Sequence, residues 1–192
     1  MKLSHMLFVF AVLLAFAGNV QAAASIGYFD AIKNETEIKP GETYFMRHGL
    51  KFERTAWDAT NYWRGTLLPI NAKVTLLKMS GSTMTISWEG AELVIKNSKN
   101  TKVDLPALAK RMFSRAEVPI NKFGDSLAGT IAAGEVVKGM TREQVIMARG
   151  YPPAHETPSI ASDNGRWIYW SSRYVKITYV FKDGVLTEGR GL

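Results

Sequence analysis

Hydrophobic and polar residues alternate through the first half of the chain. In the segment 72–96, AKVTLLKMSGSTMTISWEGAELVIK, apolar residues recur at every second position, and Gly81 and Gly90 mark two interruptions. A period of two bounded by glycine-containing turns is typical of antiparallel strands joined by hairpins. The pattern therefore predicts a strand meander within a domain that covers residues 25–103.

The pattern changes to helical spacing after the polar segment 97–102, which we interpret as a linker. Asp104 and Pro106 are helix-start signals, and the apolar residues that follow recur at intervals of three and four. A basic amphipathic helix is therefore expected at the start of a second domain, 104–192. The segment DSLAGTIAAG predicts another short helix that ends at Gly134.

The segment 139–153, GMTREQVIMARGYPP, contains the signals of a third short helix. Thr141 and Gln144 have the spacing of a capping box, in which each side chain bonds the backbone amide of the other residue. Gly150 and the two prolines that follow Tyr151 are helix-stop signals. A helix of about two turns is marginal alone, so its apolar residues should be buried.

Strand patterns return in RWIYW, 166–170, and in YVKITYVFKDGVLTEG, 174–189, where Asp183 and Gly184 predict a two-residue hairpin turn. Two short helices followed by three strands make a small α+β layer. The predicted class is thus α+β: a small antiparallel β-barrel-like domain, then a domain of two helices and a three-stranded antiparallel sheet.

Four motifs in the last part of the chain resemble one known family. GMTREQV, the following Gly-Tyr-Pro, RWIYW and ITYVFKDGVLT occur in the order found in the outer-membrane assembly lipoproteins called BamE, SmpA or OmlA. The resemblance covers roughly residues 131–190. It implies binding to protein partners and to anionic phospholipid, without catalysis. Arg149 departs from the family pattern, which has Leu at this position.

The first domain also resembles a known class. RGTLLPINAKVTLL, with a Gly and a Pro before a strand rich in aliphatic residues, is similar to bacterial Src-homology-3-like barrels.

The first 24 residues have the features of a secretory signal peptide: one Lys near the start, an apolar run over 6–17, and small residues at the end. The run is shorter than the roughly 18 apolar residues of a membrane-spanning helix. The chain has no cysteine, which the lipid anchor of the resembled family requires. We therefore expect a periplasmic or outer-membrane-associated protein without a lipid anchor.

The formal net charge is +7, and basic residues are concentrated between Lys96 and Lys122. This segment either meets an acidic protein or anionic phospholipid, or is only a solvated surface. No nucleic acid is expected as a partner of an exported protein.

The sequence motifs give little support to the hypothesis that the protein is an enzyme. FGDSL resembles the nucleophile block of the GDSL esterases, with Ser126 as the nucleophile, but Pro152 stands where that family has the Asp that precedes its His. After the leader the only histidines are His48 and His155, so no metal is expected. We predict no catalytic residue, no cofactor and no small-molecule substrate.

The expected function is that of a non-catalytic interaction or scaffold protein of the bacterial cell envelope, in outer-membrane protein assembly or envelope maintenance. The alternatives are a GDSL-like esterase that uses Ser126, and a module that binds cell wall or polysaccharide.

The candidate binding residues are basic or aromatic and lie near the third helix or in the strand that follows it: Arg142, Arg149, Tyr151, Trp167, Tyr169 and Trp170. Arg142 and Arg149 are seven positions apart and so share a helix face, where they either anchor an acidic partner or only solvate the helix. A strand with aromatic residues on both faces exposes one of them as a binding surface, unless the neighbouring domain covers it.

Overall fold

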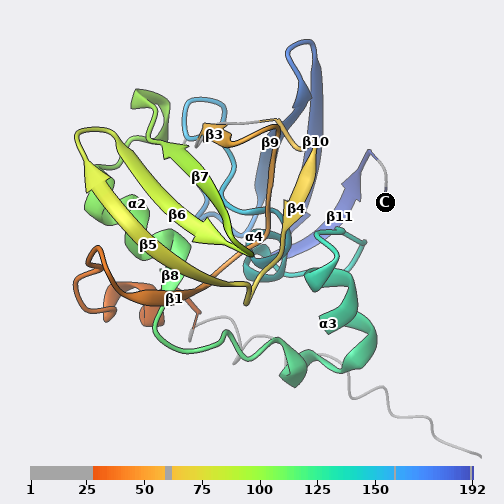
Figure 1. Cartoon of the computed structure of the whole chain (residues 1–192). Helices are drawn as coiled ribbons and strands as arrows, with labels where there is room; N and C mark the ends of the chain where they lie inside the picture. Colours follow the sequence, from red (N-terminus) through yellow and green to blue (C-terminus); the bar gives the residue numbers. More distant parts are fainter. Residues whose placement is uncertain (1–27, 59–61, 158, 191) are drawn as a thin grey trace, which may run out of the picture.

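The computed structural model describes residues 28–58, 62–157, 159–190 and 192, so the predicted leader lies outside the described residues. The fold is α+β, as predicted (Figure 1). The strands of the first half are β1 (Thr43–Met46), β2 (Leu50–Phe52), β3 (Ala56–Asp58), β4 (Thr66–Leu68), β5 (Lys73–Ser80), β6 (Thr83–Trp88) and β7 (Ala91–Lys96). The remaining elements are η1 (Lys99–Thr101), α2 (Leu105–Met112), β8 (Phe113–Ser114), η2 (Ile120–Phe123), α3 (Asp125–Ala132), α4 (Arg142–Arg149), β9 (Gly165–Ser172), β10 (Val175–Lys182) and β11 (Val185–Gly189).

The predicted meander is confirmed: β5, β6 and β7 pair antiparallel in succession. At the second hairpin Glu89 and Gly90 both have positive φ, 48° and 82°, which is the backbone that a tight two-residue turn requires. The six-stranded sheet has the order β3-β7-β6-β5-β1-β8. Its β3 strand is parallel to β7, a pairing that the alternation of residues did not predict.

Helix α2 packs on this sheet (Figure 1). Its predicted cap is confirmed, because the Asp104 side chain accepts a hydrogen bond from the Ala107 amide at 2.8 Å. Its buried side chains join Tyr44 and the apolar residues of β5 to β7 in what we call the first core. Strand β8 then pairs with β1.

Helix α2, which follows residue 103, thus packs with the strands that precede it. The predicted linker 97–102 is structured: it contains η1, and the Thr101 hydroxyl donates to the Asn97 side chain at 2.7 Å. The physical reason is that a two-turn helix must bury its apolar stripe, and the strand layer provides the surface. The second cluster of buried residues contains Val118 and many later residues, together with Tyr28 and Ile70 from the first part of the chain.

The second half contains α3, α4 and the antiparallel sheet β11-β10-β9. Its buried aromatic residues, Trp167, Tyr169, Tyr179 and Phe181, form a second core with Ile131 of α3 and the apolar residues of α4. The hairpin turn predicted at Asp183 and Gly184 is confirmed, with φ values of 51° and 75°.

Direct hydrogen bonds join the two halves. The Gly49 amide donates to the Met147 carbonyl at 2.9 Å, and the Trp63 amide donates to the Trp170 carbonyl at 2.8 Å. Gly49 is required at this approach, because a β-carbon there would lie 2.5 Å from the Ala148 carbonyl oxygen. The end of α4 and strand β9 are thus fixed against the segment that connects β1 to β4.

Within the described ranges, none of the helices has the length and apolar character needed to cross a membrane.

Candidate binding site at the junction of the two halves

The capping box fixes the start of α4. The Thr141 amide donates to the Gln144 side chain at 2.8 Å, and the Thr141 hydroxyl accepts from the Gln144 amide at 3.4 Å, as predicted. Residues 143–148 are all buried, so the helix lies inside the second half rather than on its surface. Only the two terminal residues, Arg142 and Arg149, are partly exposed.

The end of α4 is fixed against the first half by Gly150. This residue has φ +76°, and a β-carbon there would lie 2.9 Å from Nδ1 of His48, so glycine is needed for both reasons. The Tyr169 hydroxyl donates to the Gly150 carbonyl at 2.8 Å. Arg149 and Tyr151, on either side of Gly150, are therefore held where the halves meet.

The guanidinium of Arg149 lies near two aromatic rings, one from each half. Its central carbon is 5.1 Å from the ring centroid of Trp63 and 5.6 Å from that of Tyr179. Its Nε and Nη1 atoms are buried and have no hydrogen-bond partner. Buried polar groups in proteins are nearly always paired, so these two donors indicate a site for an acceptor.

Arg111 supplies a second cation to the same place. It projects from α2, and its guanidinium carbon lies 4.7 Å from the ring centroid of Tyr151. Both arginines line a hollow that we call the junction cleft, which is also lined by His48, Trp63, Tyr151 and Trp170. The cleft encloses a cavity of about 50 Å³, and its described lining contains no Asp or Glu.

His48 is buried in the wall of the cleft and is uncharged at neutral pH. Burial is the main cause that lowers its pKa from 6.5 to about 4, and the charges of Arg47 and Arg111 lower it further. Its Nδ1 atom lies 2.9 Å from the Gly49 carbonyl, which can only accept a hydrogen bond, so Nδ1 carries the proton of the neutral ring. Burial also raises the pKa of Tyr151 to about 12. The arginines therefore provide the charge of this wall at neutral pH.

The structure gives different partners to the two arginines that the helix spacing grouped together. Arg142 forms an ion pair with Asp163 at 2.7 Å and donates to the Ile160 carbonyl, and its side chain is only 16% exposed. Arg149 is stacked in the junction cleft instead. The two residues therefore lie in different surroundings, although the helix spacing grouped them.

The two faces of β9 have separate roles. Trp167 is 1% exposed and packs 4.5 Å from the ring centroid of Phe181, and Tyr169 is also buried, so this face belongs to the second core. Trp170 lies on the other face, is partly exposed and lines the junction cleft. Of the six predicted binding residues, the cleft brings together Arg149, Tyr151, Tyr169 and Trp170.

Ser126 and His155, the residues of the esterase alternative, are not joined by a hydrogen bond in the part of the chain that the structure describes. Ser126 is exposed in the first turn of α3, and its carbonyl accepts a hydrogen bond from the Thr130 hydroxyl at 2.9 Å. The ring of His155 lies 3.9 Å from a carboxylate oxygen of Glu156, and in the described chain no hydrogen bond joins it to Ser126.

His48, Trp63 and Arg111 also line the site and were not among the residues predicted from the sequence. The signal for His48 was a pair of basic residues, Arg47 and His48, directly after the apolar strand TYFM. Arg111 lies outside the apolar stripe of its helix, and the helical pattern could not show that residues of the second half lie beside it.

Comparison of the chain with protein-family models, with curated proteins and with solved structures found no match in any of the three. In the part of the chain that the structure describes, no group of three or more His, Asp or Glu residues is placed to hold a metal ion.

Proposed function

We propose that this protein is an exported, non-catalytic binding protein of the bacterial cell envelope, and that it holds a protein partner at the junction cleft. The observation that carries the proposal is the Arg149 guanidinium, whose Nε and Nη1 are buried without a partner in a hollow lined by aromatic residues. Aromatic residues and arginine are the residues most enriched at the centres of protein interfaces.

The leader and the motifs of the second half support the envelope as the location. We propose that α3, α4 and the sheet β9–β11 form a BamE-like domain, and that the strands before them form a small barrel. Two helices, then three antiparallel strands, follow the order of elements that the resemblance implies. A role in outer-membrane protein assembly or envelope maintenance follows from the same resemblance.

The protonation states support binding rather than proton transfer. A general acid or base works best when its pKa is near the operating pH. Burial moves the pKa of His48 down to about 4 and that of Tyr151 up to about 12, so neither group of the cleft exchanges a proton readily at neutral pH.

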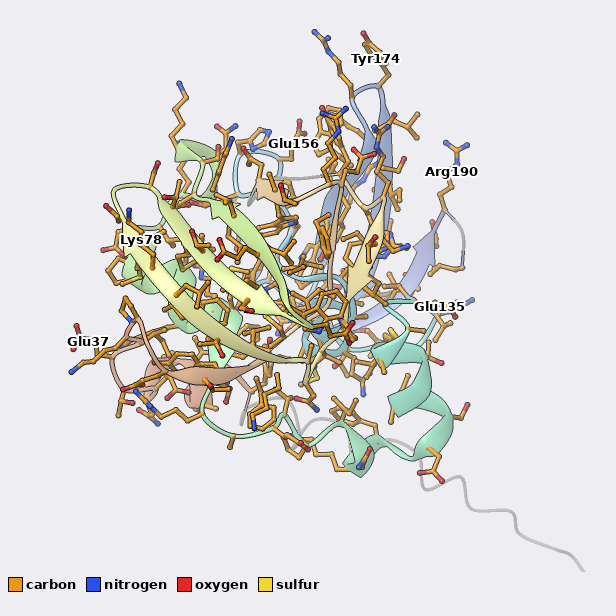
Figure 2. All side chains as sticks on the ribbon, viewed as in Figure 1. Glu37, Lys78, Glu135, Glu156, Tyr174 and Arg190 are labelled. Carbon is orange, nitrogen blue, oxygen red and sulfur yellow. The ribbon has the colours of Figure 1, made fainter. Side chains whose placement is uncertain are left out.

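A site-specific crosslinking experiment tests the proposal. A photoreactive amino acid replaces Ala154, which lines the cleft, and in a matched control it replaces Lys78, which is exposed on β5 and points away from the body (Figure 2). In intact envelopes we expect a discrete crosslinked protein from position 154 and none of the same size from position 78. Equal yields of the same product from both positions would contradict the proposal.

One observation favours anionic phospholipid as a second partner. Tyr174 is 84% exposed at the tip of the projecting β9–β10 hairpin, beside Arg173 (Figure 2). Tyrosine and basic residues together are suited to the headgroup region of an anionic bilayer. Binding to phosphatidylglycerol vesicles that is unchanged by Tyr174→Ala combined with Arg173→Ala would exclude the tip as a lipid contact.

A further inference from the structure

Cation–π contacts with two aromatic rings surround the guanidinium of Arg149, and no hydrogen bond to it is found among the described residues. The rings of Trp63 and Tyr179 lie 5.1 and 5.6 Å from its central carbon. The atoms Nε and Nη1 are buried and have no hydrogen-bond partner among the described residues, so an acceptor reaches them only when the side chains that cover them move aside. The Arg149 side chain as a whole is partly exposed and lines the cleft.

The charge of the cleft is also uncompensated. Arg111 and Arg149 both line it, and the described lining carries no carboxylate. Among the described residues neither arginine forms an ion pair, whereas Arg47, Arg64, Arg115 and Arg142 each do. Two cations at one partly dehydrated site attract an anion strongly, because the effective dielectric constant there is lower than in water.

We infer that the junction cleft binds a carboxylate attached to an apolar or aromatic body. This inference rests on the proposed function and names the chemical group that the site recognises. The cavity of about 50 Å³ exceeds the roughly 10–15 Å³ that one water molecule needs, and it has room for a carboxyl group. The apolar body then contacts Trp57, Trp63, Trp170 and the two prolines after Tyr151, which also line the cleft.

The lining favours a carboxylate over a phosphate. A phosphate has more oxygen atoms to satisfy and carries up to two charges, whereas the buried donors without a partner in the described chain are two atoms of one guanidinium. Most of the other lining side chains are aromatic or apolar, and they offer a phosphate few donors. The planar donors of arginine match carboxylate and phosphate alike, so the preference for a carboxylate rests on the apolar lining.

The test uses the full-length mature protein and pairs of probes that differ only in charge. Benzoate is compared with benzamide, and inorganic phosphate is added separately. Binding is measured by titration calorimetry and by the ¹⁵N resonance of Arg149 Nε, assigned with Arg149→Lys. We expect benzoate to shift this resonance and to bind at least about tenfold more tightly than benzamide, since a hydrogen bond to a charged group contributes more than a neutral one.

Two peptide probes distinguish which kind of molecule supplies the carboxylate. One peptide ends in phenylalanine with a free C-terminus, and the other has an internal glutamate beside phenylalanine and an amidated C-terminus. Tighter binding of either peptide than of benzoate identifies a polypeptide end or an acidic side chain as the source. Tighter binding of benzoate than of both identifies a free small acid.

Arg149→Lys keeps the charge but removes the planar donors, and we expect it to weaken benzoate binding at least about tenfold. Arg173→Lys, at the exposed hairpin tip, is the matched control and should leave binding unchanged. The comparison of benzoate with benzamide uses the unmodified protein, so it remains decisive even where a variant fails to fold.

Equal affinity for benzoate and benzamide, or tighter binding of phosphate than of benzoate, would overturn the carboxylate inference. Crosslinking from position 154 would still stand in that case, and the proposed function with it. Benzoate binding that needs Arg149, without any partner crosslinked from position 154, would support the carboxylate site and reject the protein partner.

Discussion

The guanidinium of Arg149, at the end of α4, lies 5.1 Å from the ring centroid of Trp63, a residue of the other half of the molecule. The backbone of Trp63 is in turn bonded to Trp170 of β9. The charge that lines the junction cleft is therefore part of the contact between the halves, so substitutions there affect stability as well as binding.

Arg149→Glu should lower the free energy of unfolding by more than about 2 kcal/mol, because it replaces a stacked cation with an unpaired and partly buried anion. Chemical denaturation measures the effect. Arg173→Glu, whose side chain contacts only the exposed ring of Tyr174, is the control and should change stability by less than about 0.5 kcal/mol. Equal effects of the two variants would show that the stacking does not stabilise the junction.

Thr141→Ala should destabilise the protein by about 0.5–2 kcal/mol, the usual cost of removing a helix N-cap. The substitution removes the acceptor for the Gln144 amide. Ser126→Ala is the matched control, since α3 has no side-chain cap hydrogen bond. A Thr141→Ala variant with unchanged thermal stability but lost partner binding would make Thr141 a contact residue.

Stability should fall with acidification between pH 6.5 and about 4 because of His48. The lowered pKa means that the unfolded state takes up a proton first as the pH decreases, so folding loses up to about 3 kcal/mol over this window. His48→Asn retains an N–H near the Gly49 carbonyl but does not titrate, so its unfolding free energy should decline less over the same range. Denaturation at pH 7.0, 5.5 and 4.5 measures the difference, with exposed His155→Asn as the control. Parallel pH profiles for the wild type and His48→Asn would disprove the assignment.

Arg47 and Glu35 form a buried ion pair, with side chains 4% and 10% exposed. Arg47→Met should cost about 3–5 kcal/mol, because it removes the nearest cation from the buried Glu35 carboxylate and leaves only Arg115, 4.0 Å away, among its described ion-pair partners. Adding Glu35→Met should restore part of the loss. The exposed pair of Arg64 and Glu53 is the control, and Arg64→Met there should cost less than about 1 kcal/mol. A double variant no more stable than Arg47→Met alone would refute the role of the unpaired charge.

The leader predicts a mature N-terminus at Ala23 or Ser25, since small residues precede both positions. N-terminal sequencing of the protein from its native envelope is the measurement. Recovery of membrane-bound protein that retains Met1 would contradict export with cleavage.

Sequence alone determined the features that depend on neighbours within a few positions. The capping box of Thr141 and Gln144, the Asp104 cap and the turn at Asp183 are all formed by groups no more than about four residues apart. Such interactions depend on residue type and local backbone, so they can be read from a short pattern. The alternation that predicted β5, β6 and β7 is local in the same sense.

Only the tertiary structure decided which surfaces meet. The apolar stripe of α2 showed that the helix needs an apolar partner, and the structure identifies the strand layer of the first core as that partner. Arg149 and Tyr151 were recognised because they flank a helix stop, whereas Arg111, His48 and Trp63 reach them from segments about 40 to 100 positions away. Contacts between residues so far apart in the sequence depend on how several elements pack together. The periodicity of one segment does not predict that packing. The junction cleft is therefore a property of the fold, although half of its charge comes from a helix end that the sequence marked.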